Sequence, residues 1–179
     1  MKQVEPRTAT GRKHPSRIFQ VVTADKDGRP NAMPASWCTF SSAEPIMMAV
    51  SVASDRYTHK LMGAADDFVL SFPNKEQKEA VSYCGRNSGK NVDKFEETDL
   101  ETIPADEVNS PLIEDSVACF ECKKSDSIET GDHTLFVGEV VATHVSERFT
   151  EKIYTTKGWH EKGAKGFKTI AEINDHEEV

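Results

Sequence analysis

Four side chains able to hold a phosphate group lie close together in the segment SDRYTHK, residues 54–60. Two are hydroxyls and two are cations: Ser54, Arg56, Thr58 and Lys60. The segment follows an apolar run and begins a helical pattern, so the positive end of the helix would add to the attraction for an anion. A solvated helix start capped by Ser54 or Asp55 accounts for the same residues. The pattern therefore predicts an anion site or a helix cap, and leaves both open.

The glycine-rich segment GRNSGKN, residues 85–91, has the composition of a nucleotide-binding loop but not its spacing. A P-loop has four residues between its glycines and a Ser or Thr after the Lys. Here only Arg86, Asn87 and Ser88 separate the two glycines, and Asn91 follows Lys90. The segment therefore argues against a nucleotide hydrolase of the P-loop type.

The cysteines of CFEC, Cys119 and Cys122, have the spacing found in many metal and redox sites. They fall in a predicted strand, where residues three apart point to opposite faces. The two sulfurs could not then chelate one ion, and the sequence contains no second CxxC. We expect two buried packing residues and no metal site.

His133 is the histidine with the most suggestive position, because it lies in GDH at the entry to a long predicted strand. Its imidazole changes charge near neutral pH and can hydrogen-bond a ligand. A solvated turn histidine without a role explains the position equally well, so both interpretations stay open.

Most of the remaining sequence consists of short β-branched and aromatic runs separated by turns, which predicts a mainly β fold with a closed or partly closed barrel. We expect strands at 17–24, 30–39, 46–53, 67–73, 116–125 and 133–145, and helices at 54–64 and 74–84. DKDG at 25–28 and SIETGDH at 127–133 predict turns. We expect an acidic excursion outside the core at 96–115, a flexible arm at 1–15 and a polar extension at 146–179. Gly138, inside the last strand, predicts a bulge or a close backbone approach.

The composition limits the possible partners. The chain has 179 residues, a net charge of −8 and four cysteines. An acidic protein is a poor partner for nucleic acid. The longest apolar run, at 45–53, is too short for a membrane span, which needs about 20 residues. The basic N-terminus lacks the apolar centre of a secretory signal. We expect a single cytoplasmic domain with no nucleic-acid or membrane partner.

Five segments occur in the order found in one known family. They are VVTADKDGRPNAMPASWCTFSSAEPIMMAVSVASDRYTHKLM, DFVLSFP, SGKNVDKF, SPLIEDSVACFEC and GDHTLFVGEV. Over about residues 15–145 the chain resembles the flavin reductase-like, flavoredoxin-type family of FMN-binding split barrels. The resemblance implies a six-stranded antiparallel Greek-key barrel with a few short helices, a homodimer, and FMN near the dimer interface. After about residue 146 the sequence departs from the family pattern.

The resemblance also assigns site residues. Those that match the stretch around the flavin ring are Asn31, Ala32, Met33, Ala35, Ser36, Trp37, Cys38 and Thr39, with Ser51 and Val52 on the adjacent strand. Arg56, Thr58 and Lys60 match the positions that hold the FMN phosphate. The residues of a loop that closes over the flavin are Lys90, Asp93, Lys94 and Phe95. His133 falls near the ring, as the candidate catalytic residue. Small residues in NAMPASWCT would permit close approach of backbone N–H donors to the flavin, and Trp37 either stacks near the ring or fills the barrel.

The implied activity is that of a flavin reductase, which passes a hydride from NADH or NADPH to flavin and supplies reduced flavin to an oxygenase or a protein acceptor. A second possibility is an electron carrier of the flavoredoxin type, with tightly held FMN that exchanges electrons with protein partners. A third is a ligand-binding or sensing module, since split barrels also hold haem and other flat molecules. The absence of a GxGxxG fingerprint does not distinguish these, because such reductases bind nicotinamide in the flavin cleft.

Overall fold

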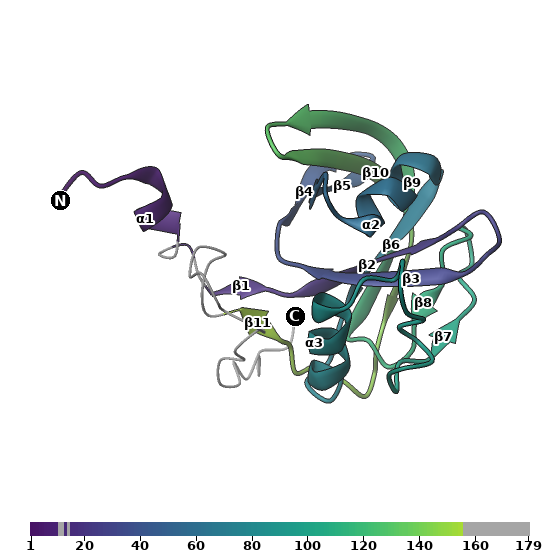
Figure 1. Ribbon diagram of the computed structural model, residues 1–179. Coiled ribbons are helices and arrows are strands. Elements are labelled where there is room, and N and C mark those ends of the chain that lie inside the picture. Colours follow the sequence, from purple (N-terminus) through teal and green to yellow (C-terminus); the bar gives the residue numbers. More distant parts are fainter. Residues whose placement is uncertain (11–12, 14, 156–179) are drawn as a thin grey trace.

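The protein is a mainly β structure built on one antiparallel sheet, as seen in a computed structural model that describes residues 1–10, 13 and 15–155 (Figure 1). The strands of this sheet are β2 (Phe19–Ala24), β3 (Pro30–Ala35), β4 (Cys38–Ala43), β5 (Ile46–Ala53), β6 (Asp67–Phe72), β9 (Ala118–Thr130) and β10 (His133–Val145). Two small ladders join β1 (Ser16–Arg17) to β11 (Tyr154–Thr155) and β7 (Thr102–Ile103) to β8 (Leu112–Ile113). The helices are α1 (Pro6–Thr10), α2 (Tyr57–Ala64) and α3 (Lys78–Arg86). The predicted mainly β fold is confirmed, and a strand or helix occupies each predicted position.

The sheet curls into a split barrel because its two edge strands are consecutive in the chain. The strand order is β3-β2-β6-β9-β10-β5-β4, so β3 and β4 are the edges, and only Ser36 and Trp37 connect them. Two residues reach about 7 Å, which keeps the two edges close together. The prediction of one strand over 30–39 is therefore wrong at its centre. β3 pairs with β2 whereas β4 pairs with β5, and the sheet has seven strands where six were expected.

The barrel interior is filled by side chains that alternate with outward-facing ones along each strand. Its buried members are Phe19, Val21, Met48, Val50, Val52, Met62, Phe68, Leu70, Phe72, Cys122 and Phe136. Gly138 of β10 faces this interior. A Cβ on Gly138 would lie 2.8 Å from the ring of Phe68 and 2.9 Å from Cβ of Cys122, and the β9–β10 register shifts beside it. Both predicted features of Gly138, a bulge and a close approach, are confirmed.

A second apolar cluster lies on the outer face of β2, β3, β6 and β9, and it contains part of the acidic excursion. Leu100, Leu112 and Ile113 are at most 4% exposed and pack with Val22 and Val69 of the sheet. The prediction that 96–115 lies outside the core is therefore wrong for these three residues. The sequence did not indicate their burial, because one isolated leucine and one Leu-Ile pair among polar residues show no strand or helix period.

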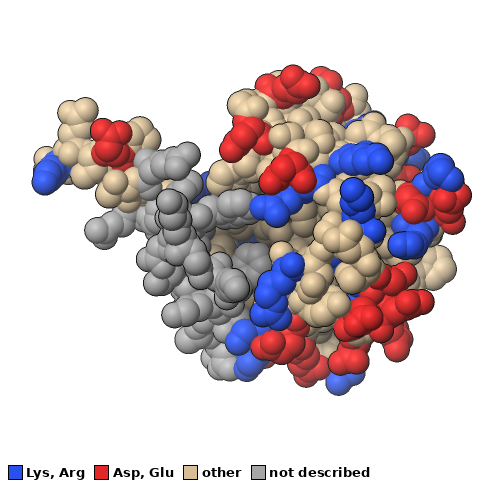
Figure 2. Space-filling view, viewed as in Figure 1, with Lys and Arg blue, Asp and Glu red and all other residues tan. Residues whose placement is uncertain are grey.

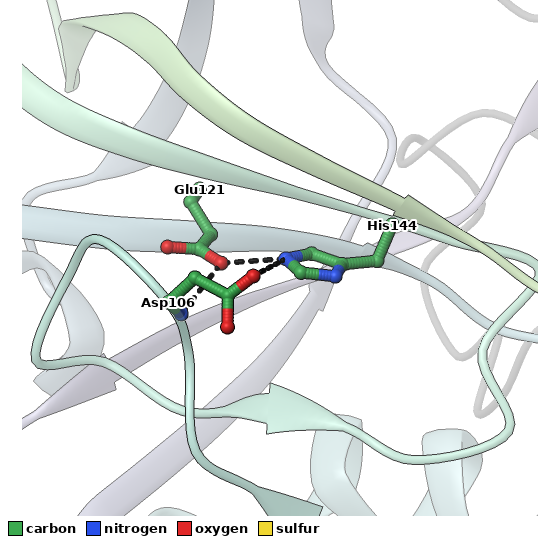
Figure 3. A group of neighbouring side chains, drawn as sticks. All are labelled: Asp106, Glu121 and His144. Atoms are coloured by element: carbon green, nitrogen blue, oxygen red, sulfur yellow. Dashed lines mark hydrogen bonds and ion pairs between the residues drawn. The ribbon is translucent and has the colours of Figure 1, made fainter.

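Two buried carboxylates hold the same excursion against the sheet. Glu121 of β9, 0% exposed, accepts hydrogen bonds from the backbone N–H groups of Asp106 and Glu107 at 3.0 and 2.7 Å. Nε2 of His144 lies 2.6 Å from the same carboxylate (Figure 3). Asp67 of β6 accepts the backbone N–H groups of Asn109 and Ser110 at 3.0 Å. Burying a carboxylate is costly unless such donors surround it, so these contacts make the excursion an integral part of the fold.

The two long strands β9 and β10 form a hairpin that is tighter than expected. The sequence predicts a turn over 127–133, but β9 continues to Thr130 and only Gly131 and Asp132 form the connection. Gly131 has φ of +62°, which two-residue hairpin turns require at this kind of position. His133 is therefore the first residue of β10, directly after a tight turn.

The polar extension begins as part of the fold. Ile153 is 1% exposed and packs with Ile18 and Val81, and β11 pairs with β1. From residue 156 onward the predicted extension lies outside the described residues. At the other end, the predicted arm contains the short helix α1, which Figure 1 shows away from the sheet.

Charged side chains of both signs are dispersed over the surface. Figure 2 shows acidic groups gathered at the top of the view, where the β9–β10 hairpin lies in Figure 1. None of the described helices is long and apolar enough to cross a membrane.

Candidate functional site

The connection between β3 and β4 places Trp37 on the protein surface beside His133. The indole is 40% exposed, so it does not fill the barrel, as one interpretation of the sequence held. Its ring centroid lies 5.0 Å from that of His133, with 31° between the planes. The backbone N–H of Ser51 donates to the carbonyl of Trp37 at 3.0 Å, which ties this segment to β5. The two aromatic groups thus form one wall at the end of β5 and β10.

The start of α2 is bonded to the turn that carries His133. Both the backbone N–H and the hydroxyl of Ser54 donate to the carbonyl of Asp132, at 3.1 and 3.3 Å. Ala53, the preceding residue, is the register partner of His133 across β5 and β10. Arg56 follows two residues after Ser54, and its backbone N–H donates to Ala53. The candidate phosphate segment and the candidate ring segment are therefore directly connected.

The predicted cap of α2 is wrong. The N-cap residue is Arg56, in extended conformation, and no side chain caps the helix. The N–H of His59 donates to the carbonyl of Arg56 at 3.0 Å, so the N–H groups of Tyr57 and Thr58 are the ones that could bind an anion. No acidic residue lies in the first turn. Arg56 has a half-exposed side chain with Nε 3.3 Å from Asp55, and Lys60 is exposed. Thr58 differs from both, since it is 2% exposed and its hydroxyl accepts a hydrogen bond from Asn31.

Asn31 joins three segments that the sequence assigned to the flavin site. Its Nδ2 donates to Oγ1 of Thr58 at 2.9 Å, and it is 4% exposed. A Cβ on Gly89 would lie 2.1 Å from Asn31 Oδ1, so the 88–91 loop is pressed against β3 at this point. Oδ1 of Asn31 and Oγ1 of Thr23, its cross-strand partner, are buried without a hydrogen bond among the described residues. Thr23 and Gly89 are additions to the predicted site.

The loop residues predicted to cover the flavin have different roles here. Lys94 is 4% exposed, and its Nζ donates to the carbonyls of Ala32 and Cys84 at 2.6 and 2.9 Å. Burial lowers the pKa of Lys94, and the nearby Cys84 acts in the opposite direction. The carboxylate of Asp93 accepts the backbone N–H of Phe95 at 3.0 Å. Phe95 packs on the outer apolar cluster.

Among the four loop residues, Lys90 presents an exposed cation. The side chain of Lys94 instead holds the loop on β3, whereas that of Asp93 accepts backbone N–H groups within the loop. The loop therefore reaches the site with its 88–91 end, next to Asn31.

Several predicted residues have side chains in the core. Val52 is 1% exposed inside the barrel and Ala32 is 0% exposed in the outer cluster. Met33, Ala35 and Cys38 pack against the interior cluster. Ser36, Thr39 and Ser51 are at least partly exposed. A ligand here would meet the core residues of this set through the backbone, which agrees with the backbone contacts implied by the resemblance.

The cysteines of CFEC point to opposite sides of the sheet, as the strand period predicts. Cys119 belongs to the outer cluster and Cys122 to the barrel interior. Burial raises the pKa of the Cys122 thiol to about 12, and all four cysteines are free. In the described part of the chain the grouping with metal-ligand character is Asp106, Glu121 and His144, where the carboxylate of Glu121 already accepts two backbone N–H groups.

These contacts form one continuous surface from Trp37 through His133 and Ser54 to Arg56, Asn31 and Gly89. It contains an exposed aromatic wall, two exposed cations beside an uncapped helix start, and buried polar atoms without partners. An aromatic wall suits a flat ring, and cations beside a helix start suit a phosphate, so the residues present fit the FMN cofactor implied by the resemblance.

Comparisons with known proteins identify the family of the chain. Residues 12–163 match the sequence model of the family described as "Flavin reductase like domain". An uncharacterized protein of Pyrococcus abyssi is 36% identical over 137 residues, which cover 76% of this chain and 78% of that protein. The NADH-dependent FAD reductase of Streptomyces globisporus is 32% identical over 113 residues, 63% of this chain and 61% of that protein.

Two solved structures show the same fold. The FMN-binding protein of Thermus thermophilus, crystallised with 1-cyclohex-2-enone, is 31% identical with a TM-score of 0.73, over 83% of this chain and 80% of that one. The flavoredoxin of Desulfovibrio vulgaris (Miyazaki F) is 26% identical with a TM-score of 0.79, over 96% of this chain and 94% of that one. The fold, the site and the extent of these matches together show that the chain belongs to the flavin reductase-like family of split-barrel flavoproteins.

Proposed function

We propose that this protein binds FMN on the surface between Trp37 and Gly89 and acts as a cytoplasmic NAD(P)H-dependent flavin reductase. The observation that carries the proposal is the direct bonding of the α2 start to the His133 turn through Ser54. It brings an anion-binding helix start and an exposed aromatic wall into one site. When bound, FMN supplies a ring that accepts a hydride at N5.

In this proposal, different residues contact the phosphate and the ring of FMN. Arg56, Lys60 and the N–H groups of α2 are placed to hold the phosphate, with Lys90 as a further cation from the loop. The bond between Nδ2 of Asn31 and the Thr58 hydroxyl holds α2 against β3, whereas Oδ1 of Asn31 is left without a hydrogen bond among the described residues. Trp37 and His133 bound the place where the ring and an electron donor would meet, and the indole excludes water from that side.

Similarity to the NADH-dependent FAD reductase supports the reductase activity, with an oxygenase or another acceptor protein as the partner that uses the reduced flavin. The similarity to flavoredoxin, over nearly the whole of both chains, supports the alternative of an electron carrier with tightly held FMN. The two proposals differ in whether NADH or NADPH reduces the flavin directly.

The test begins with the visible spectrum of the freshly purified protein. We expect a yellow protein, or uptake of FMN in a near one-to-one ratio with quenching of its fluorescence. Anaerobic addition of NADH or NADPH should then bleach the flavin. A colourless protein that does not quench FMN fluorescence would refute the flavin site. A yellow protein that neither nucleotide bleaches would favour the electron carrier, and red colour on adding haem to a colourless protein would favour the ligand-binding module.

The outer face of β5 and β10 supports the proposal of a homodimer. Register partners share a face, so Ser51, Leu135 and Val137 point away from the barrel interior, and all three are partly exposed. Ala49, the partner of Val137, is already buried at 2% exposure. Ile128 of β9, paired with Leu135, is 51% exposed. A sheet face of small and apolar residues that stays in contact with water is unfavourable, so a second copy of the chain is the proposed cover.

The dimer is tested by light scattering after size-exclusion chromatography. We expect a mass of twice the chain mass of 19.9 kDa for the wild type. Leu135→Lys should shift it to the monomer, because it places a charge in the apolar interface. Thr102→Lys, an exposed residue of β7, adds the same charge elsewhere and should stay dimeric. A wild type that is monomeric at micromolar concentration would contradict the proposal.

A further inference from the structure

The carboxylate of Asp132 lies against the imidazole of His133 in the turn between β9 and β10. Oδ1 of Asp132 is 2.6 Å from Nδ1 of His133. The Asp132 side chain is 93% exposed and the His133 side chain 14% exposed. An ionised carboxylate can only accept a hydrogen bond, so the ring nitrogen in this contact must carry the proton.

The turn is held in place at several points, which makes this contact part of the local architecture. Ser54 donates two hydrogen bonds to the carbonyl of Asp132. The hydroxyl of Thr130 donates to the carbonyl of His133 at 3.1 Å. Gly131 takes the positive φ that lets the two-residue turn close. Asp132 and His133 therefore have little freedom to separate through backbone motion.

Trp37 restricts the imidazole from the other side. The indole lies beside the imidazole with 5.0 Å between the ring centroids and 31° between the planes. Rotation of the imidazole about its Cβ–Cγ bond would therefore change this contact and break the one with Asp132. Nε2 of His133 has no hydrogen-bond partner among residues 1–10, 13 and 15–155. It is thus the one polar atom of the imidazole left for a ligand.

We propose that Asp132 is a positioning residue that holds neutral His133 in the Nδ1–H tautomer. Nε2 is then a hydrogen-bond acceptor on a ring that lies beside Trp37. The tautomer of a histidine is set by the partner of its other nitrogen. A ligand group that bonds to Nε2 must donate an N–H or an O–H, and a bare carbonyl oxygen has no partner there.

The tautomer of His133 decides which group of the hydride donor can hydrogen-bond to the imidazole. The carboxamide of nicotinamide carries both an NH₂ and a carbonyl oxygen, and the Nδ1–H tautomer selects the NH₂. Which face of the nicotinamide meets the flavin depends on which way the carboxamide is held. This role in the reaction rests on the proposed reductase function, whereas the tautomer itself does not.

The tautomer can be measured by ¹⁵N-histidine NMR with long-range proton–nitrogen correlation in alkaline buffer. The His133 signals are identified by their loss in His133→Gln. We expect the Nδ1–H pattern in the wild type. Asp132→Ala should convert it to a mixture rich in Nε2–H, the form that an unrestrained imidazole favours. Asp132→Glu should restore part of the wild-type pattern, and Glu129→Gln should leave it unchanged, because this exposed acid of the same hairpin is not bonded to His133.

The role toward the hydride donor is tested by steady-state kinetics of FMN-loaded protein with NADH and with NADPH. Asp132→Ala should raise KM for the preferred nucleotide by about 2- to 10-fold, the effect of one neutral hydrogen bond. The Kd for FMN should stay within about twofold of the wild type, because the phosphate and ring contacts remain.

The possible outcomes separate the two proposals. An Nε2–H ring in the wild type, with or without flavin reduction, overturns the positioning role of Asp132. An Nδ1–H ring with an unchanged KM in Asp132→Ala overturns its role toward the hydride donor. A wild type that neither nucleotide reduces, but whose ring is Nδ1–H and becomes Nε2–H in Asp132→Ala, supports the positioning role and refutes the reductase function.

Discussion

Substitution of Gly89 by Ala should disrupt the junction of β3, α2 and the 88–91 loop. The added Cβ would lie 2.1 Å from Oδ1 and 3.1 Å from Cγ of Asn31, and 3.6 Å from Cδ1 of Tyr57. Ordinary contact begins near 3.4 Å, so Asn31 and the loop must separate by more than about 1 Å. Asn31 cannot yield easily, because it is buried and bonded to Thr58.

The expected cost combines overpacking with a weakened buried hydrogen bond. Overpacking costs about 1–3 kcal/mol, and the weakened hydrogen bond about 0.5–1.5 kcal/mol. Because the structure can partly relax, we expect a total loss of about 1–3 kcal/mol in the free energy of unfolding. For a chain of this size the melting temperature should fall by roughly 3–10 °C. FMN binding should weaken as well, because the loop that carries Lys90 moves away from α2.

Gly63 provides a matched control. It lies inside α2, and a Cβ there would have nothing within 4 Å. Gly63→Ala should therefore stabilise the protein by about 0.5–1 kcal/mol through helix propensity. Thermal and urea unfolding should show a lower free energy of unfolding for Gly89→Ala and a higher one for Gly63→Ala, although both variants add one methyl group.

A double-mutant cycle with Asn31→Ala tests the proposed cause. Removing the Asn31 amide makes room for the new methyl group, so Gly89→Ala should cost at least about 1 kcal/mol less in that background. A Gly89→Ala protein as stable as the wild type would refute the reasoning. So would strictly additive effects, because they would show that Asn31 and Gly89 do not contact each other.

Three further predictions concern the phosphate, the cysteines and acid stability. Arg56→Ala should weaken FMN binding by about 1.5–3 kcal/mol, the value of a charged hydrogen bond, and should not affect riboflavin binding, in fluorescence titrations of both flavins. Replacing Cys119 and Cys122 by Ala should lower the free energy of unfolding through lost packing, without loss of flavin binding and without stoichiometric zinc in the wild type by elemental analysis. Burial alone would raise the pKa of Asp67 and Glu121, but hydrogen bonds outweigh it and both pKa values lie below their ordinary ones. The stability from these depressed pKa values is present above the pKa of the unfolded chain, so it should decline as pH falls below about 5 in urea titrations.

Each of these three predictions has its own control and its own contradicting result. Arg148→Ala removes a cation at a distant, exposed position and should leave FMN affinity unchanged; equal wild-type affinity for riboflavin and FMN would contradict the phosphate assignment. Loss of flavin reduction in the double cysteine variant would overturn the packing role. Asp67→Asn should be less stable at neutral pH and show a weaker acid dependence, and an unchanged pH profile would contradict the carboxylate argument.

Local sequence chemistry was sufficient wherever neighbouring residues decide the structure. Asp25 bonds the backbone N–H groups of Asp27 and Arg29 and Gly28 has φ of +80°, so the predicted turn between β2 and β3 needs no distant contact. The opposite orientation of Cys119 and Cys122 follows from the strand period alone. The order of the family motifs was enough to predict the barrel.

Only the tertiary structure decided features that depend on residues far apart in the chain. The break at Trp37 exists because β3 and β4 pair with different strands, a fact absent from the local pattern. The sequence predicts Lys94 as a cation of the loop that covers the flavin. It is instead buried, because two backbone carbonyls accept the hydrogen bonds that water would otherwise accept from its ammonium group. Asp132 and His133 are adjacent in sequence, but the contact with the ring of Trp37, nearly a hundred residues earlier in the chain, depends on the tertiary structure. Turns and strand faces arise from the backbone geometry of a few residues, whereas burial and hydrogen-bond partners arise from the pairing of distant strands.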